Sequence, residues 1–430
     1  MTADLVVRAG RVGGVPRDVV VDRGVIVALT EGGHGGPALR SIDADGLDVF
    51  PGAVDAHVHF DAPGRDDWEG WATGSLAAAA GGVTTVVDMP IDSHPPTLTA
   101  AAVRDKRTAA TGVSLVDFAL WGGLVPRNVG ALNSLLDAGV VGLKAFLCDS
   151  GWPEFPACTH EALDRGMRVA AAADVPVAVH CEDPVLFEQD GRSRPVASEV
   201  AAVATAGAAA ARHGARLHVV HCSSSEAVEE SMRWPGATVE TCPHYLALDD
   251  QAASRIGPDA QCCPPVRDES TRLRMVRAAL EGSIDTIASD HSPCPPEGKQ
   301  GDAPFAGVSG VQTTLSVLLT LDLPLAVLDR LRTAAARVCG LAGKGGLAVG
   351  SDADLALVDL AGTWTVGPDT LHTRHRRSPF IGRVLPGVVR ATLVRGEVVY
   401  EDGAQVGEPI GRFLAPGALA RSARLIGVTR

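Results

Sequence analysis

Eight short runs of β-forming residues recur along the middle of this chain, and alanine-rich helical stretches separate them. One such stretch is Glu199–Ala211, for which Ser198 is the expected N-cap. This alternation predicts an α/β fold, a (β/α)8 TIM-like barrel whose strand C-termini carry the chemistry. An open doubly wound sheet stays the alternative, although no Gly-x-Gly-x-x-Gly sequence follows the first run. The runs are Ala53–His57, Val83–Asp88, Leu115–Leu120, Val141–Phe146, Pro176–His180, Arg216–His221, Ala237–Thr241 and Ile284–Ser289.

Both ends of the chain differ from this middle part, because they contain β-type runs joined by glycine-containing turns. Asp22-Arg23-Gly24, between two valine-rich runs, indicates a hairpin. Residues 354–359 and 392–400 have the same character. We therefore expect one small β domain built from both termini, with boundaries at residues 1–50, 51–345 (the barrel) and 346–430. A length of 430 residues suits a large barrel with an accessory domain.

Composition excludes several classes of protein. The formal net charge is -13 and no dense basic run occurs, so we expect no nucleic-acid partner. The nine cysteines are scattered without a Cys-x-x-Cys pair, which fits a reducing cytosol. No basic segment followed by an apolar one starts the chain, so we expect no signal peptide and a cytoplasmic location. The apolar stretch 311–328 contains Asp322 and Pro324, which indicates packed helix and no membrane span.

The first strand of the expected barrel ends in two histidines, His57 and His59. Side chains on a strand alternate faces, so both imidazoles point the same way. Two neutral imidazoles on one face form half of a metal site. A structural histidine pair in a core strand is the alternative, and further ligands on other strands would exclude it.

The fourth expected strand contains Lys144 inside an apolar run. Lysine is almost never fully buried without a partner, so this position requires an explanation. One interpretation is that the side chain extends to the barrel rim. Another is that CO2 carboxylates the amine, because an ammonium has no lone pair for a metal whereas a carbamate offers two oxygens.

Three further strands end in residues that bind metals. The fifth ends at His180, the sixth at His221, and the eighth places Asp290 at the same level. His218 lies three residues before His221 and faces the other side of a regular strand. We therefore expect it to pack in the core or to support the ligands without binding a metal itself. Four histidines, a lysine and an aspartate from five strands predict a metal site.

Motifs along nearly the whole chain support the same interpretation. With them the chain resembles the amidohydrolase superfamily, in the cyclic-amidohydrolase branch of dihydroorotases, hydantoinases and allantoinases, and it is most similar to the allantoinases. The motifs are Pro51–Pro63 with Gly64-Arg65, Trp68-Glu69-Gly70, Gly81-Gly82-Val83-Thr84-Thr85, Asp88-Met89-Pro90, Gly142–Phe146, His180-Cys181-Glu182, Cys242-Pro243-His244-Tyr245, Pro264-Pro265-Val266-Arg267 and Ser289–Pro296.

The resemblance implies a binuclear metal centre in a (β/α)8 barrel with a small β-sandwich from both termini. His57, His59 and Asp290 would bind one metal, His180 and His221 the other, and carboxylated Lys144 would bridge them. We expect two divalent ions, zinc first, although such ligands also accommodate manganese, cobalt or iron. A metal-bound hydroxide would attack the ring carbonyl, and Asp290 would carry its proton to the leaving nitrogen.

The substrate is expected to be a neutral ring. Similar dihydroorotases carry an arginine at position 61 and an asparagine at 92, which hold the substrate carboxylate, whereas Asp61 and Asp92 would repel it. Allantoin, hydrolysed to allantoate, fits best. The alternatives are hydantoinase or dihydropyrimidinase-like activity and a non-catalytic scaffold, which would typically lose ligands. The expected substrate-binding residues are Arg65, Asp92, His244, Cys263 and Arg267, and the expected assembly is a homo-oligomer, a tetramer or dimer, without nucleic acid or membrane.

Overall fold

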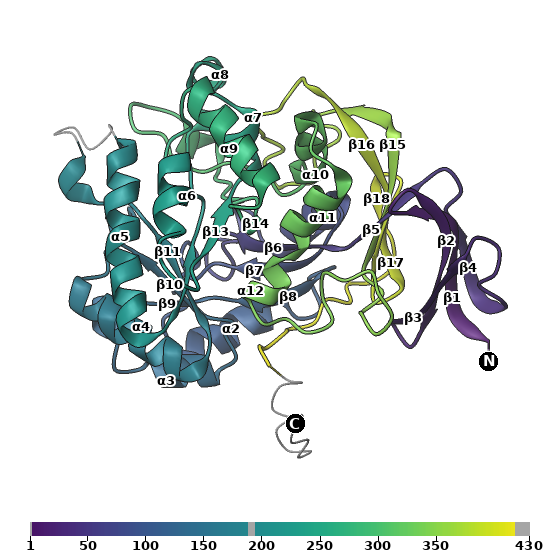
Figure 1. Cartoon of the computed structure of the whole chain (residues 1–430), viewed down its shortest axis with the longest axis horizontal. Helices are drawn as coiled ribbons and strands as arrows, with labels where there is room; N and C mark the ends of the chain where they lie inside the picture. Colours follow the sequence, from purple (N-terminus) through teal and green to yellow (C-terminus); the bar gives the residue numbers. More distant parts are fainter. Residues whose placement is uncertain (1, 188–193, 418–430) are drawn as a thin grey trace.

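A computed structural model describes residues 2–187 and 194–417 (Figure 1). Each of the eight predicted runs contains a parallel strand, and in each the side chains are almost entirely buried, as strands covered on both faces require. They form a three-stranded sheet, β6-β7-β8, and a six-stranded sheet, β9 to β14 in chain order. The strands are β6 (Ala53–Val58), β7 (Val83–Asp88), β8 (Asp117–Leu120), β9 (Gly122–Gly123), β10 (Leu143–Phe146), β11 (Pro176–His180), β12 (Arg216–Val219), β13 (Thr238–Thr241) and β14 (Thr286–Ile287).

The two sheets meet at both of their edges. At one edge, Val141 N donates to Leu120 O at 2.9 Å, and Leu120 ends β8 just before β9 begins. At the other edge, His59 N donates to His291 O at 2.8 Å, and Val58 bridges His291 in parallel register. Together the two sheets give the molecule a TIM-barrel-like fold.

The helices lie outside the strands (Figure 1). Thr99, Thr159, Ser224 and Asp268 cap helix N-termini by accepting a backbone N–H. The prediction that Ser198 caps the fifth helix is wrong, because the helix already begins after Pro195. The helices are α1 (Trp71–Ala80), α2 (Ala100–Ala110), α3 (Leu132–Asp137), α4 (His160–Ala173), α5 (Val196–His213), α6 (Ser225–Ser231), α7 (Pro243–Ala247), α8 (Asp250–Ile256), α9 (Glu269–Glu281), α10 (Thr314–Leu318), α11 (Leu325–Thr333) and α12 (Ala335–Val338).

Both termini contribute to a second sheet beside the barrel, as expected (Figure 1). Its strands form one hydrogen-bonded sheet of nine, in which β5 of the N-terminal part pairs with β15 of the C-terminal part. The Asp22-Arg23-Gly24 hairpin is confirmed between β2 and β3. The strands are β1 (Ala3–Val12), β2 (Val15–Asp22), β3 (Val25–Glu31), β4 (Ala38–Asp43), β5 (Asp48–Pro51), β15 (Leu355–Thr365), β16 (Val384–Val394), β17 (Glu397–Glu401) and β18 (Ala404–Gln405). Residues 418–430 of the expected C-terminal part lie outside the described residues.

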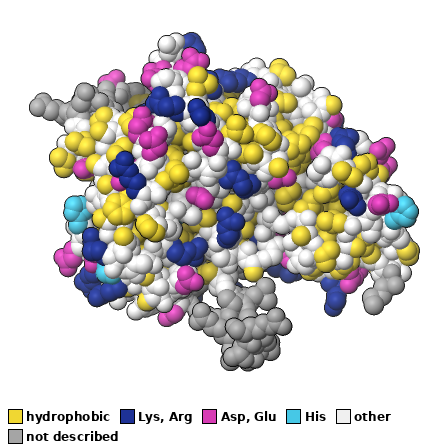
Figure 2. Space-filling model, in the orientation of Figure 1, with side chains coloured by type: hydrophobic (Ala, Val, Ile, Leu, Met, Phe, Trp, Pro, Cys, Tyr) yellow, Lys and Arg dark blue, Asp and Glu magenta, His cyan; other side chains and the backbone are white. Residues whose placement is uncertain are grey.

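A buried ionic cluster fastens this sheet to the barrel. Lys344 Nζ lies 2.5 Å from Asp117 of β8 and 2.9 Å from Asp354, next to β15. Within the described part of the chain, no helix has the length and apolarity needed to cross a membrane. On the face shown in Figure 2, acidic and basic side chains are intermixed.

Candidate metal centre

Four histidines and an aspartate line one cavity of about 560 Å³ at the C-terminal ends of the barrel strands. His57 lies in β6 and His180 ends β11, while His221 and Asp290 follow β12 and β14 within a few residues. Strand ends that are far apart in the sequence therefore place these groups together, as the alternation predicts.

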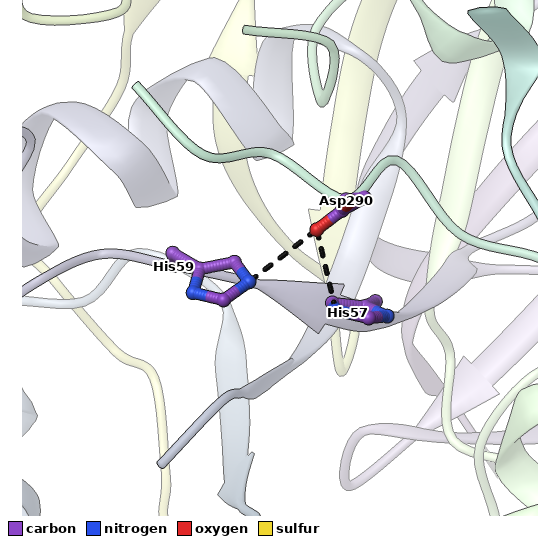
Figure 3. A group of neighbouring side chains, drawn as sticks. All are labelled: His57, His59 and Asp290. Carbon is purple, nitrogen blue, oxygen red and sulfur yellow. Dashed lines mark ion pairs between the residues drawn. The ribbon is translucent and has the colours of Figure 1, made fainter. Parts of the chain in front are cut away.

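His57, His59 and Asp290 form a compact group (Figure 3). One carboxylate oxygen of Asp290, Oδ1, lies 3.2 Å from His57 Nε2 and 3.3 Å from His59 Nε2. Two imidazole nitrogens and a carboxylate oxygen converge from two strand ends. This is a donor set that holds a divalent transition metal.

His180 and His221 form a second group beside the first. His180 Nδ1 lies 3.1 Å from His221 Nε2, and the His221 ring lies 5.4 Å from that of His57, centroid to centroid. His221 has a φ of 40° and Asp290 one of 47°, a backbone region that residues with a Cβ seldom adopt. Such conformations cluster at functional sites.

Lys144 lies in β10 and is fully buried. Among the described residues its Nζ has no hydrogen-bond partner, and it lies 4.8 Å from the centre of the Phe146 ring. Burial lowers its pKa to about 8, so that a neutral amine is accessible near neutral pH. The side chain does not extend to the rim, and burial makes its neutral amine more accessible than that of an exposed lysine.

Protonation in the site favours metal binding at most ligands. Burial lowers the pKa of His57 and holds the pKa values of His180 and His221 well below the ordinary value, so these imidazoles are neutral. Burial opposes ionisation of Asp290, but His57 and His59 nevertheless hold its pKa well below normal. Burial would also lower the pKa of His59, yet Asp290 and another carboxylate raise it to about 10. A metal cation bound at the site would supply the positive charge that a proton on His59 otherwise supplies to these carboxylates.

Three of the four histidines have a carboxylate next to the ring nitrogen that faces away from the site, and sequence analysis identified none of these acids as a partner of a histidine. His59 Nδ1 lies 2.6 Å from Asp92, and His180 Nε2 lies 2.8 Å from Glu182. Carboxylates in this position fix the orientation of metal-binding imidazoles.

The third such carboxylate is Glu240 of β13, which is fully buried. Its Oε1 lies 2.8 Å from His57 Nδ1, and its Oε2 lies 3.3 Å from His218 Nε2. His218 Nδ1 in turn lies 2.8 Å from Thr238 Oγ1. His218 is therefore connected to His57 through Glu240 and is not among the described residues that line the cavity. The signal for Glu240 was a charged residue inside a strand, the same signal that identified Lys144.

Of the expected substrate-binding residues, the cavity lining includes Asp92 and Cys263. Arg65, His244 and Arg267 are not among the described lining residues. Arg65 packs 3.7 Å above the Trp152 ring and donates to the carbonyl of Asp92.

His244 and Arg267 are held within the protein. Burial lowers the pKa of His244 to about 4. Arg267 forms an ion pair with buried Glu199 at 3.0 Å.

The expected repulsion by two aspartates needs a correction. Asp61 is buried, and burial, with the nearby Asp92 charge, raises its pKa well above the ordinary value. Burial therefore favours the protonated form of Asp61, which weakens the repulsion expected from this residue. The cavity lining also includes Arg194, Phe146, Trp152 and Phe305, which sequence analysis did not select as substrate contacts.

Comparisons with known proteins agree with this geometry. The model of the amidohydrolase family matches residues 49–399. An allantoinase of Rubrobacter xylanophilus is 43% identical over 96% of this chain and 98% of its own, and one of Solibacter usitatus is 42% identical over 97% and 98%. Among solved structures, an L-hydantoinase (dihydropyrimidinase) from Arthrobacter aurescens superposes with a TM-score of 0.91 at 32% identity, covering 96% of this chain and all of its own.

Proposed function

The chain belongs to the amidohydrolase family, and we propose that it opens the ring of allantoin by metal-dependent hydrolysis to allantoate. The observation that carries this proposal is the set of four histidines, an aspartate and a buried, unpartnered lysine at the strand ends of the described barrel. Such a set can hold cations that activate water for hydrolysis of a cyclic amide C–N bond, and the allantoinases named above match nearly the full chain.

Two divalent cations fit these residues. His57, His59 and Asp290 would hold one, His180 and His221 the other, and carboxylated Lys144 would bridge them. The mixed nitrogen and oxygen donors suit zinc first, and manganese, cobalt or iron as well. The buried Nζ, which has no hydrogen-bond partner among the described residues, supports carboxylation, because a carbamate would give this atom a function.

The cations, when bound, would lower the pKa of water and polarise the ring carbonyl. Asp290 is placed to accept a proton from the attacking water, because its carboxylate faces the cavity in the ionised form. It would then deliver that proton to the departing nitrogen, which is a poor leaving group as an anion. Glu240, Asp92 and Glu182 would hold the imidazoles in orientation during the cycle.

Another neutral cyclic amide is the second candidate substrate. The similarity to the Arthrobacter aurescens L-hydantoinase favours it, at lower sequence identity than the allantoinases. A scaffold without activity is disfavoured because all six ligand positions are filled by ligand-type residues. We propose further that the protein works as a homo-oligomer, a tetramer or dimer, in the cytoplasm, and that residues 51–345 form the catalytic domain.

Elemental analysis combined with an allantoin assay tests this proposal. Active protein should contain about two equivalents of transition metal per chain, and chelation should remove metal and activity together. Full activity after the metal content has fallen well below one equivalent would refute metal dependence.

A further inference from the structure

Arg194 is the one lysine or arginine among the described residues that line the cavity. It comes from the segment between β11 and α5, and its side chain is 19% exposed. Asp290, by contrast, follows β14, which β12 and β13 separate from β11 in the sheet. The guanidinium therefore faces the cavity from a different wall than the proposed proton carrier.

The guanidinium is held in place from two sides. Its Nη1 donates to Glu182 at 2.5 Å, and its Cζ lies 4.6 Å from the centre of the Phe187 ring. Glu182 is fully buried and also contacts His180, so both of its neighbours restrain the carboxylate that holds the guanidinium. A cation fixed in this way loses little entropy when a ligand binds.

The backbone of Arg194 is anchored as well. Arg267 Nη1 donates to the carbonyl of Arg194 at 2.5 Å. Arg267 is itself fixed by Ser223 at 2.8 Å and by Glu199 at 3.0 Å. Arg267 does not line the cavity, and this arrangement gives it a role in holding the arginine that does.

We infer that Arg194 determines substrate specificity by donating hydrogen bonds to the carbonyl oxygen of the arm outside the scissile ring. This inference rests on the proposed function, in which that arm is a ureido group. A urea-type oxygen is a strong acceptor and a guanidinium is a forked donor, so the two are complementary. Unsubstituted hydantoin has the same ring without the arm and would not use this contact.

The kinetic consequence follows from the distance between the arm and the reacting bond. A contact with a group that does not react stabilises the bound substrate and the transition state alike, so its loss raises KM and leaves kcat nearly unchanged. Losing a hydrogen bond to a charged donor corresponds to about a 10- to 100-fold change.

The experiment compares Arg194→Gln and Arg194→Lys with the wild type, on allantoin and on hydantoin. For Arg194→Gln we expect kcat/KM for allantoin to fall about 10- to 100-fold, mainly through KM. On hydantoin we expect a change below about threefold. Arg194→Lys keeps a charge for Glu182 without the fork, so its loss on allantoin should be intermediate. If the glutamine variant fails to fold, kcat/KM of the lysine variant on allantoin and on hydantoin tests the inference.

Two controls separate recognition from support of the metal centre. Arg212→Gln removes an exposed charge on α5 and should leave both activities unchanged. Metal content of each variant is measured alongside, and we expect it to equal that of the wild type. A fall in kcat with KM unchanged, equal losses on both substrates, or lost metal would overturn the inference, because Arg194 would then act through Glu182 on His180. Wild-type protein inactive on allantoin would instead overturn the proposed function.

Discussion

Replacing Glu240 by glutamine should weaken metal binding at the His57 site while the fold is kept. Glutamine has nearly the same shape, and its carbonyl can still accept from His57 Nδ1. The substitution removes a negative charge that is fully buried and that contacts both His57 and His218. This charge makes His57 a stronger ligand and fixes its tautomer.

The size of the effect follows from the contacts. Glu240 Oε1 lies 2.8 Å from His57 Nδ1, a full hydrogen bond to a charged acceptor, which is worth about 1.5–3 kcal/mol. The neutral amide retains part of this bond, and losses of about 10- to 100-fold in metal affinity are usual for such carboxylates, or about 1.4–2.7 kcal/mol.

The assay is titration of metal-free protein with zinc against a chromophoric chelator, with thermal unfolding measured in parallel. Glu226→Gln serves as the control, because that glutamate pairs with Arg274 at the surface and is not among the described residues that line the cavity. We expect weaker binding of one of the two metals in Glu240→Gln and no change in Glu226→Gln. A folded Glu240→Gln protein with both affinities within about threefold of the wild type would refute the role given to Glu240.

Three further predictions concern the ligands themselves. Lys144→Ala should lose most activity and metal, and short carboxylic acids should restore part of both. An electron-density map of fully active, metal-loaded protein that shows an unmodified ammonium at Lys144 would contradict its role as the bridging ligand. Asp290→Asn should abolish turnover in a folded protein, since the amide cannot carry the proton. A near-normal kcat would show that another residue is the general base, and His244 would be the next candidate. Reconstitution with zinc at equal concentrations of dissolved CO2 should be faster at pH 9 than at pH 6, because CO2 reacts with the neutral amine. Burial lowers the pKa of Lys144 to about 8, so only about one amine in a hundred is neutral at pH 6. A rate of reconstitution that is the same at both pH values would refute this.

The barrel-like fold and the grouping of the candidate ligands could be predicted because local signals specify them. A two-residue spacing on a strand places His57 and His59 on one face, and a lysine in an apolar run signals a special environment. Glu240 carries the same signal, a charged residue between Val239 and Thr241 of an expected strand, although it was not predicted.

The partners of the ligands could not be predicted, because they depend on contacts between distant segments. Glu240 meets His57 across 183 positions, and Arg267 meets the Arg194 carbonyl across 73. Burial is equally a property of the folded state, and it raises the pKa of Asp61 well above the ordinary value where the sequence alone indicates a charge. The start of α5 was misplaced for a local reason, since Pro195 supplies a helix start before Ser198.

The most direct test of the central proposal is kcat/KM on a panel of allantoin, hydantoin, dihydrouracil and dihydroorotate, using one metal-loaded preparation. We predict the highest value for allantoin and a far lower one for dihydroorotate, whose carboxylate would have to approach Asp92 and the ionised Asp290. Arg194, the one cationic side chain among the described lining residues, is already paired with the buried carboxylate of Glu182 and offsets this repulsion little. Turnover of dihydroorotate as fast as that of allantoin, or cleavage of hydantoin or dihydrouracil without cleavage of allantoin, would contradict the proposed substrate.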